Sequence, residues 1–437
     1  MTAEFPFSRL VDARAQQRRF LFLQGPPGPF FRELASALAK RGAGVSRINL
    51  SGGDVHDWPT GATNYRGRMR DWPTFFDRFV RRHDITDLVV FGDCRPVHQA
   101  ALNMAKLRSL RVFVFEEGYI RPNWMTLERD GVNGHSPFGR DPKAILENAA
   151  WLPPVPELPP ITASFKRRMR DSYWHYHHVV TGRLLLKFPF YRSHRHGSIT
   201  LDGIGWLLKL RRTNRLARHA DALIRQLAGA RYFLFPLQLN GDYQIRAHSP
   251  FGSMTAAVDF VIDSFAGHAP AEAILLIKDH PLDSGFRDWR RYVARRAEAL
   301  GIAHRVQHIA GGSLEDLAQQ AVGMVCINST SGTLGLAMGK PVVVLGDAVY
   351  DIPGLTHEGG LDSFWCDPQT PDPVLYDAFK RSLHARCLVR GGLASASAMR
   401  ILIENSVDGL LLDTGAAGLV PDLPWQAYSR NRAPEQS

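Results

Sequence analysis

Short apolar runs alternate with longer stretches whose apolar residues recur every three or four positions through the first third of the chain. Runs of the first kind are typical of buried strands, and stretches of the second kind are typical of amphipathic helices. The pattern predicts strands at Phe20–Leu23, Val45–Leu50, Asp87–Phe91 and Arg111–Phe115, and helices at Phe30–Lys40, Pro73–Arg82 and Pro96–Leu107. Because helices fall between the strands, we expect a parallel sheet flanked by helices.

A second series of the same kind begins near residue 229. It predicts strands at Arg231–Leu237, Ala273–Ile277, His304–His308, Gly323–Ile327 and Pro341–Leu345, and helices at Met254–Phe265, Trp289–Leu300, Leu314–Gln320 and Gly332–Met338. Two such series predict an α/β fold of two Rossmann-like lobes with a central cleft between them, which is a GT-B-like arrangement.

The stretch between the two series breaks the alternation. A proline-rich run, PPVPELPP, follows Leu152 and leads into a basic stretch that mixes aromatic and apolar residues with its charges. We interpret this stretch as a basic helical insertion or linker. The predicted organisation is a first lobe over residues 1–150, the basic region over 151–228, a second lobe over 229–420 and a tail over 421–437.

Composition narrows the class of protein. A chain of 437 residues with 45% hydrophobic content can bury a large core in two or three units. The cysteines are far apart and form no CxxC pair, which argues against a disulfide framework or a thiolate zinc site and fits a reducing cytoplasm. The N-terminus lacks the apolar stretch of a secretory signal, and the longest uncharged window, Leu317–Gly339, is too polar to span a membrane. We therefore expect a soluble or peripheral protein.

The net charge of +11 is concentrated in the basic region. Between Thr162 and Ala220 there are thirteen Lys or Arg residues and two acids, so the rest of the chain is neutral. Such a local excess indicates one anionic partner rather than a general affinity for polyanions.

The segment Asn328–Thr333 carries five hydroxyl or amide side chains around one glycine, where a predicted strand meets a predicted helix. Unpaired N–H groups and the positive end of the helix dipole favour a phosphate at such a position. The alternative is an ordinary Ser/Thr helix cap. On this segment alone both interpretations stay open.

Two further segments follow strands of the same predicted lobe. Lys278-Asp279-His280-Pro281 could neutralise the phosphate of a departing nucleotide, although a His-Pro pair usually marks only a turn. The loop that contains Gln238 and Asp242 could bind a base or ribose, and a solvated loop is the alternative. Because ligands of open α/β sheets bind at the carboxyl ends of strands, we expect the polar loops to face one crevice.

In the first lobe a predicted strand runs into Glu116 and Glu117. Neighbouring carboxylates raise each other's pKa, which suits acid-base or nucleophilic chemistry, and strand alternation predicts that only one of them faces the cleft. Arg121 could pair with the carboxylate of an acidic sugar. The alternative is a solvent-facing acidic turn. The loop that carries Asn133, His135 and Ser136 offers plausible acceptor contacts.

Five segments together resemble the capsule polysaccharide biosynthesis family, the KpsS/LipB type of β-Kdo transferase: QGPPGPFF, FEEGYIRPNW, FPLQLNGDYQI, KDHP and NSTSGTLGLAMGKPVVVLGDAVYDIPGLT. The match runs from Arg18 to Thr356 with the segments in the family's order. The resemblance implies a GT-B-like retaining transferase that moves Kdo from CMP-Kdo to a phosphatidylglycerol-type lipid, with the CMP-sugar as co-substrate and no cofactor or metal. The first lobe is then the acceptor and catalytic lobe, and the second binds the nucleotide sugar.

The resemblance also implies site residues. The nucleotide phosphate and ribose are expected at His280 and Pro281 and at Ser329, Thr330, Ser331 and Gly332. The residue pattern described above adds Lys278, Gln238 and Asp242 to the expected nucleotide-sugar site. Gln24, Gly25, Arg121 and His135 are expected to bind the acceptor or sugar. Larger two-module relatives have Glu-Asp-Gly where this chain has Glu-Glu-Gly, so either glutamate is a candidate nucleophile. We favour Glu117, with Glu116 in support, in a double displacement that retains the anomeric configuration.

In this family setting the basic region, with Phe165, Tyr173, Trp174, Leu184–Leu186, Phe188, Phe190 and Trp206 among its cations, is expected to lie on an anionic bilayer. The protein would then be cytoplasmic and peripheral at the inner membrane, in contact with other capsule biosynthesis or export proteins. Nucleic acid is not expected as a partner, because no nucleic-acid motif accompanies the charges. A plain helical bridge remains an alternative for the region. For the whole chain the alternatives are a non-catalytic capsule assembly or export factor and a nucleotide-sugar epimerase.

Overall fold

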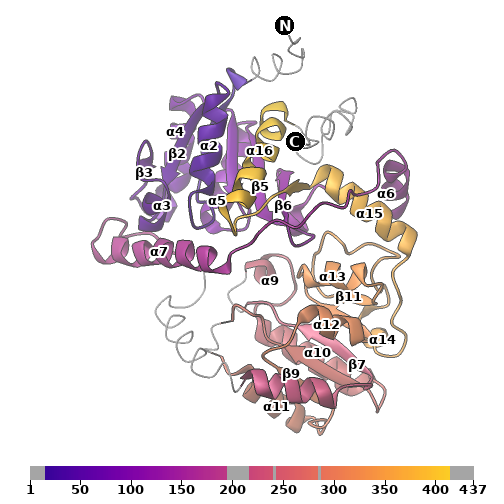
Figure 1. The fold of residues 1–437 in the computed structure, drawn as a ribbon. Coiled ribbons are helices and arrows are strands. Elements are labelled where there is room, and N and C mark those ends of the chain that lie inside the picture. Colours follow the sequence, from indigo (N-terminus) through magenta and orange to yellow (C-terminus); the bar gives the residue numbers. More distant parts are fainter. Residues whose placement is uncertain (1–14, 194–215, 240–242, 284–286, 414–437) are drawn as a thin grey trace. The chain divides into compact units, whose positions relative to one another are not determined.

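The computed structural model describes residues 15–193, 216–239, 243–283 and 287–413 (Figure 1). These residues form two compact units. The first contains the described residues of 1–138, 148–193 and 380–437, and the second contains those of 139–147 and 194–379.

The first unit contains a sheet of seven strands in the order β12-β6-β5-β4-β1-β2-β3. Five of its strands are parallel: β1 (Arg19–Phe22), β2 (Gly44–Asn49), β3 (Thr63–Asn64), β4 (Asp87–Phe91) and β5 (Arg111–Glu117). Two antiparallel strands extend its edge: β6 (Trp124–Arg129) and β12 (Leu388–Arg390). The strand order reverses between β1 and β4, as in Rossmann-like sheets.

Helices cover both faces of this sheet because its strands are apolar on both sides. Phe20 and Phe22 of β1 pack against α2 (Phe30–Lys40) and α16 (Ala396–Leu412). Leu21 and Leu23 pack on the opposite face against α4 (Trp72–Arg82) and α5 (Pro96–Leu107). Strand alternation therefore distributes one segment of the chain between two cores.

A buried ion cluster joins the beginning of this sheet to its last helix. Arg18 donates from Nε and Nη2 to the carboxylate of Asp87 at 2.7 and 2.5 Å, and Arg111 donates to the same carboxylate at 2.7 Å. The guanidinium of Arg18 also donates to the carbonyl oxygens of Leu410 and Leu411 near the end of α16. Asp87 is fully buried, so it is the shared counterion of two arginines.

The basic region contributes a helix of the first unit, α7 (Phe165–Leu184), which packs on α3 (Gly52–Asp57). Two glycines allow the close approach. A Cβ atom on Gly52 would stand 2.0 Å from the carbonyl oxygen of His178, and one on Gly182 would stand 3.0 Å from the Cα atom of Gly52. The two helices therefore touch through their backbones.

Replacing Gly52 by alanine is expected to lower the unfolding free energy by about 1–3 kcal/mol, because the new methyl group must displace α7. Thermal unfolding followed by circular dichroism measures the change. Gly267→Ala is the matched control, since a Cβ atom there meets nothing within 4 Å and alanine favours the helix that contains it, α10 (Met254–His268). Equal melting temperatures for wild type and Gly52→Ala would contradict the close packing.

The second unit contains a five-stranded parallel sheet in the order β11-β10-β7-β8-β9. Its strands are β7 (Tyr232–Pro236), β8 (Ile274–Lys278), β9 (Val306–Ile309), β10 (Gly323–Cys326) and β11 (Val342–Val344). Its helices include α9 (Tyr243–Ala247), α10 (Met254–His268), α11 (Trp289–Ala299), α12 (Leu314–Gln320), α13 (Ser331–Ala337) and α14 (Gly360–Phe364). The order again reverses, between β7 and β10. Residues of α10, α11 and α14 share one core with β7 and β8.

The α/β class and the two Rossmann-like lobes predicted from the sequence are confirmed. Each strand and helix expected in the two series is present, with ends that agree within three residues. The helical character of the basic region is confirmed over α7.

The two units do not follow the four consecutive ranges expected from the sequence. The chain leaves the second unit within α15 (Pro373–Arg386) and returns to the first, where β12 and α16 complete the sheet and its covering layer. Residues 148–193 of the linker and basic region also belong to the first unit. The expected tail over 421–437 lies outside the described residues.

Candidate active site

The candidate residues of the first unit lie at the carboxyl ends of three neighbouring strands. Gln24 follows β1, Asp93 and Arg95 follow β4, and Glu116 and Glu117 end β5. Since β1 and β4 flank the reversal of strand order, their ends form the crevice where sheets of this type bind ligands.

The two glutamates lie on opposite faces of the sheet. Glu116 shares its face with Val112 and Val114, which pack in the core beneath α4 and α5. One of its carboxylate oxygens accepts the backbone N–H of Glu117 at 2.9 Å. The other lies 3.1 Å from the position that a Cβ atom would take on Gly92, directly after β4. The carboxylate of Glu116 is therefore beside the end of β4.

Glu117 forms an ion pair with Arg168 of α7. Burial alone would raise the pKa of Glu117, but the charges of Arg168 and Arg121 outweigh it and hold that pKa below its ordinary value. Glu117 is consequently a carboxylate that stays ionised at neutral pH. The side chain of Arg121 is exposed and donates from Nε to the carbonyl oxygen of Gly118 at 3.4 Å, so its charge acts on Glu117 without a direct bond between them.

Gln24 is the centre of a buried polar network. Its amide nitrogen donates to Asp54 at 3.1 Å and to the hydroxyl of Tyr191 at 3.0 Å, and its amide oxygen accepts from Arg95 at 3.2 Å. The side chain is 2% exposed. Both amide hydrogens are thus used within the protein, and Gln24 holds Arg95 in place.

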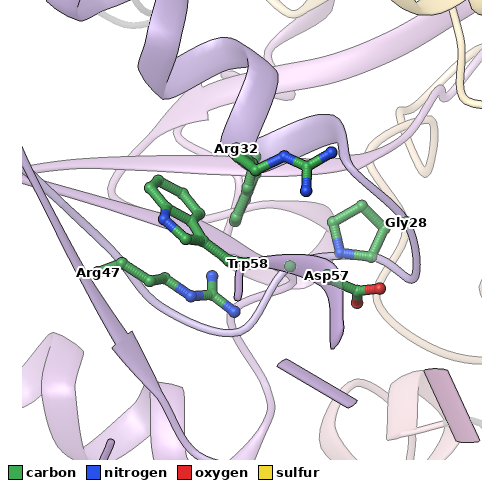
Figure 2. Close-up of a pocket in the computed structure, with 8 residues that line it drawn as sticks. Gly28, Arg32, Arg47, Asp57 and Trp58 are labelled. Carbon is green, nitrogen blue, oxygen red and sulfur yellow. The ribbon is translucent and has the colours of Figure 1, made fainter. Parts of the chain in front are cut away.

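The loop after β1 encloses only a small cavity. Gly25, Gly28, Arg47, Asp57 and Trp58 are among the residues that line it (Figure 2). Its volume of about 10 Å³ is the room of a single water molecule, too little for a sugar. Asp57 accepts from His175 of α7 at 2.6 Å at this point, and burial raises the pKa of Asp57. The loop therefore supports the crevice and forms no closed sugar pocket.

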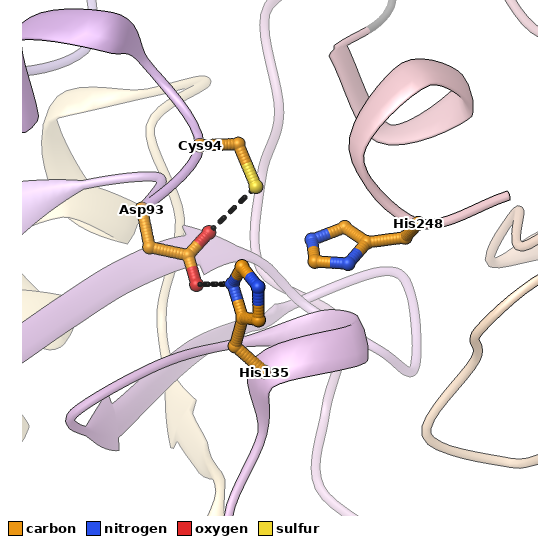
Figure 3. A group of neighbouring side chains, drawn as sticks. All are labelled: Asp93, Cys94, His135 and His248. Carbon is orange, nitrogen blue, oxygen red and sulfur yellow. Dashed lines mark hydrogen bonds and ion pairs between the residues drawn. The ribbon is translucent and has the colours of Figure 1, made fainter. Parts of the chain in front are cut away.

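Asp93 holds the loop that carries His135 in place through hydrogen bonds. Its carboxylate accepts from Cys94 Sγ at 3.1 Å and from His135 Nδ1 at 2.9 Å (Figure 3). It also accepts the backbone N–H of Val132 at 3.2 Å. Carboxylate, thiol and imidazole are the donor types of a Zn²⁺ site, and these three offer one ligand atom each within 4.8 Å of the others. The sequence did not reveal this group, because about forty residues separate its parts.

Glu128 connects the loop that carries Tyr119 to the loop that carries Ser136. Tyr119, which follows the acidic strand end, donates its hydroxyl hydrogen to Glu128, and Ser136 donates to the other carboxylate oxygen at 2.6 Å. The backbone N–H of Asn133 in turn donates to the Tyr119 hydroxyl at 2.7 Å. Burial raises the pKa of Glu128 to about 7. The sequence pattern did not predict this hydrogen-bonded group, because it did not predict the strand Trp124–Arg129 that contains Glu128.

Because the pKa of Glu128 is raised, we expect the free energy of unfolding to depend on pH. The folded protein keeps a proton that the unfolded chain releases, so the contribution of Glu128 is full below its ordinary pKa of 4.5 and is lost as pH rises through about 7. Wild type should therefore lose stability relative to Glu128→Gln between about pH 4.5 and 7. Melting temperatures of both proteins across that range test it. A constant difference between them would show that Glu128 does not titrate there.

In the second unit the loops after β7 and β10 are bonded to each other. Gln238 donates from its amide to the Asn328 side chain at 2.9 Å, and the backbone N–H of Asn328 donates back to Gln238 at 3.4 Å. The Asn328 amide also donates to the carbonyl oxygen of His248 at 3.1 Å. Asp242, expected beside Gln238, lies outside the described residues.

The loop after β8 orients His280. Its Nδ1 accepts the backbone N–H of Leu282 at 3.1 Å, so the neutral ring carries its hydrogen on Nε2. Lys278 ends β8 with its side chain buried, and its Nζ donates to the carbonyl oxygen of Asp279 at 3.4 Å. Pro281 follows on the surface.

The segment after β10 turns tightly into α13. Ser329 Oγ accepts the N–H of Ser331 at 3.1 Å, as a local cap does, whereas the side chain of Thr330 makes no capping bond. Gly332 lies under Tyr350, whose hydroxyl oxygen would be 2.3 Å from a Cβ atom on that glycine. Tyr350 itself donates to the carbonyl oxygen of Ser329 at 2.5 Å. A side chain at position 332 would therefore displace the turn.

These three loops follow adjacent strands, since β7 lies between β10 and β8. The backbone N–H of Leu237 donates to the carbonyl oxygen of Lys278 at 2.8 Å, which continues the pairing of β7 with β8 beyond the strand ends. The candidate nucleotide-binding residues that the structure describes thus share one edge of the second sheet.

Comparison with known proteins identifies the family of the chain. The family model described as "Capsule polysaccharide biosynthesis protein" matches residues 86–393. The chain belongs to this family. Its sequence is 33% identical to the capsule polysaccharide export protein KpsS of Escherichia coli, over 83% of this chain and 93% of the relative. It is 36% identical to the capsule polysaccharide modification protein LipB of Neisseria meningitidis, over 85% of this chain and 91% of the relative. The resemblance to the KpsS/LipB type is confirmed.

Among solved structures, the chain is similar to the KpsC β-Kdo 2,7 transferase of Thermosulfurimonas dismutans, with a TM-score of 0.44 and 13% sequence identity. The match covers 89% of the present chain and 99% of the KpsC chain.

Proposed function

We propose that this member of the capsule family is a glycosyltransferase that moves Kdo from CMP-Kdo to a phosphatidylglycerol-type lipid with retention of configuration. The observation that carries the proposal is Glu117, a partly buried carboxylate at a strand end that its ion pair with Arg168 keeps ionised. An ionised carboxylate is the form that attacks an anomeric carbon. The family membership supports the proposal with a role in capsule synthesis.

In the first step a Glu117 oxygen bonds to the anomeric carbon as the bond from that carbon to the CMP phosphate oxygen breaks. CMP leaves with the bonding electron pair. The imidazole of His280 and the charge of the buried Lys278, in the loop that follows β8, suit the stabilisation of the developing phosphate charge.

In the second step a hydroxyl of the acceptor attacks the same carbon from the opposite face, and the bond to Glu117 breaks. Glu116 is the proposed base that takes the hydroxyl proton, since its carboxylate lies beside the end of β4. Two inversions give net retention.

The test is incubation of the full chain with CMP-Kdo and lysophosphatidylglycerol, with CMP release and the glycolipid product followed by mass spectrometry. Release that depends on the acceptor supports a transferase. Turnover of a nucleotide sugar without acceptor would indicate an epimerase instead. No turnover, with lipid or partner binding intact, would favour an assembly or export factor, the role that the name of the E. coli relative suggests.

We further propose that the protein docks on the inner face of the cytoplasmic membrane through the end of α7. Leu184, Leu185 and Leu186 are 65–75% exposed, and Arg183 and Lys187 flank them. Apolar side chains beside cations suit an anionic lipid surface better than they suit water. None of the helices in the described part of the chain has the length and apolar character needed to cross a bilayer. Residues 194–215 of the basic region, which include Arg195, Trp206, Lys209, Arg211, Arg212 and Arg215, lie outside the described residues.

Replacing Leu184–Leu186 by serines is expected to weaken binding to vesicles that contain phosphatidylglycerol by about tenfold or more, because three apolar contacts with the bilayer are lost. Vesicle flotation measures the binding. Leu107→Ser, a change at a leucine 77% exposed at the end of α5, is the matched control. Unchanged flotation of the triple variant would leave α7 as a plain structural helix.

A further inference from the structure

Arg95 differs from the deeply buried arginines of its unit. Arg18 pairs with Asp87 and Arg47 pairs with Asp54, so each has a carboxylate counterion. Arg95 is partly buried and forms no ion pair with any residue that the structure describes. Within the described ranges its hydrogen bonds go to the carbonyl oxygens of Gln24 and Gly25 and to the Gln24 amide oxygen, at 3.2–3.4 Å.

All three bonds use the same nitrogen, Nη1. Nε and Nη2 of Arg95 have no hydrogen-bond partner in the described part of the chain, so their N–H groups remain for a ligand. Withdrawing a guanidinium from water without a counterion is costly, and such groups are typical of binding sites. Gln24 fixes the orientation of this guanidinium through neutral hydrogen bonds and adds no negative charge to it.

The position of Arg95 is that of a ligand contact. It directly follows β4 at the reversal of strand order and is the N-cap of the twelve-residue helix α5, whose dipole adds positive potential there. Glu116 lies within electrostatic reach of Arg95. A group held by Arg95 would therefore lie close to the proposed catalytic pair.

The residues that precede Tyr191 in the sequence indicate that the ligand of Arg95 is amphiphilic. Tyr191 bonds to Gln24, and the residue before it, Phe190, is 47% exposed beneath the guanidinium of Arg68. The apolar residues Leu184–Leu186 precede it in the same segment. The stretch from Leu184 to Tyr191 thus connects an apolar surface to the polar network that holds Arg95. A lipid with an anionic head group needs both kinds of contact.

We propose that Arg95 binds the phosphate of the lipid acceptor at the end of β4. This inference rests on the proposed function and assigns the acceptor head group to a named residue. The guanidinium donates from Nε and Nη2 to two phosphate oxygens, and Gln24 is the positioning residue that orients it.

Calorimetric binding of glycerophosphoglycerol, the water-soluble head of such a lipid, tests the site without turnover. Arg95→Gln is expected to raise the Kd by about 10- to 100-fold, and Arg95→Lys by less, because lysine keeps the charge but not the fork. Arg32→Gln, which removes an exposed arginine of the same unit, should bind as wild type does. Equal affinity of wild type and Arg95→Gln, with melting temperatures unchanged, overturns the proposal.

Kinetics with CMP-Kdo and two acceptors separate the sources of the anion. Arg95→Gln should lower kcat/KM for lysophosphatidylglycerol by about 10- to 100-fold and change that for a monoacylglycerol of equal chain length much less. A raised KM for CMP-Kdo alone would place the sugar carboxylate at Arg95 and overturn the assignment, as would equal losses on both acceptors. If no sugar is transferred but head-group binding depends on Arg95, the proposed function fails and the anion site stands.

Discussion

Replacing Glu117 by glutamine is expected to lower kcat for sugar transfer by about 10³-fold or more, because the amide cannot form the covalent bond to the anomeric carbon. Binding of CMP should change little, since the nucleotide is proposed to bind residues of the second unit. Initial rates of CMP release measure kcat, and fluorescence titration measures CMP affinity.

Two companion variants separate chemistry from structure. Arg168→Gln removes the ion pair but keeps the carboxylate, so it should reduce the rate far less than Glu117→Gln does and raise the pH at which activity appears. Glu116→Gln should slow transfer while leaving a glycosylated enzyme detectable by intact-protein mass spectrometry. If Glu117→Gln retains most activity and Glu116→Gln abolishes the adduct, the two glutamates have the opposite roles.

Replacing Asp87 by alanine is expected to lower the unfolding free energy by about 3–5 kcal/mol, the range for breaking a buried ion pair from one side. Arg18 and Arg111 would both lose their shared counterion, and Asp87 is fully buried in the sheet. Denaturant unfolding monitored by circular dichroism gives the value.

The control for Asp87→Ala is Asp408→Ala. Asp408 pairs with Arg41 at 2.9 Å, but both side chains are about one-third exposed, so the loss should be within about 1 kcal/mol. Comparable losses for the two variants would show that burial does not make the Asp87 cluster more important than a surface pair.

The sequence predicted those parts of the fold that depend on local pattern. Apolar runs predict strands such as Asp87–Phe91, and apolar periodicity predicts helices such as Pro96–Leu107. The structure has both elements at the same residues. The missed elements depend on distant partners. Strand β12 has three residues and exists because Leu388–Arg390 pairs with Trp124–Thr126 of β6, more than 250 positions earlier. Helix α3 contains two glycines and forms where α7 packs on it.

The candidate site shows the same division. Glu116, Glu117, His280 and the Ser329–Gly332 segment stand out because they follow apolar runs directly. Their partners do not: Arg168 is 51 residues from Glu117 and was counted only as one charge of a basic stretch. Arg95 had a usable signal, since it follows a buried strand within Gly92-Asp93-Cys94-Arg95-Pro96, the same kind of position that singled out the glutamates.

The return of the chain to its first unit has a consequence for biosynthesis. During translation the first strands emerge early, but β12 and α16, which complete the sheet edge and cover Phe20 and Phe22, emerge last. Until the intervening unit has been made, this face of the first unit is covered by α2 alone and stays partly exposed. Premature termination near residue 380 would leave that face permanently open to chaperones, proteases and aggregation.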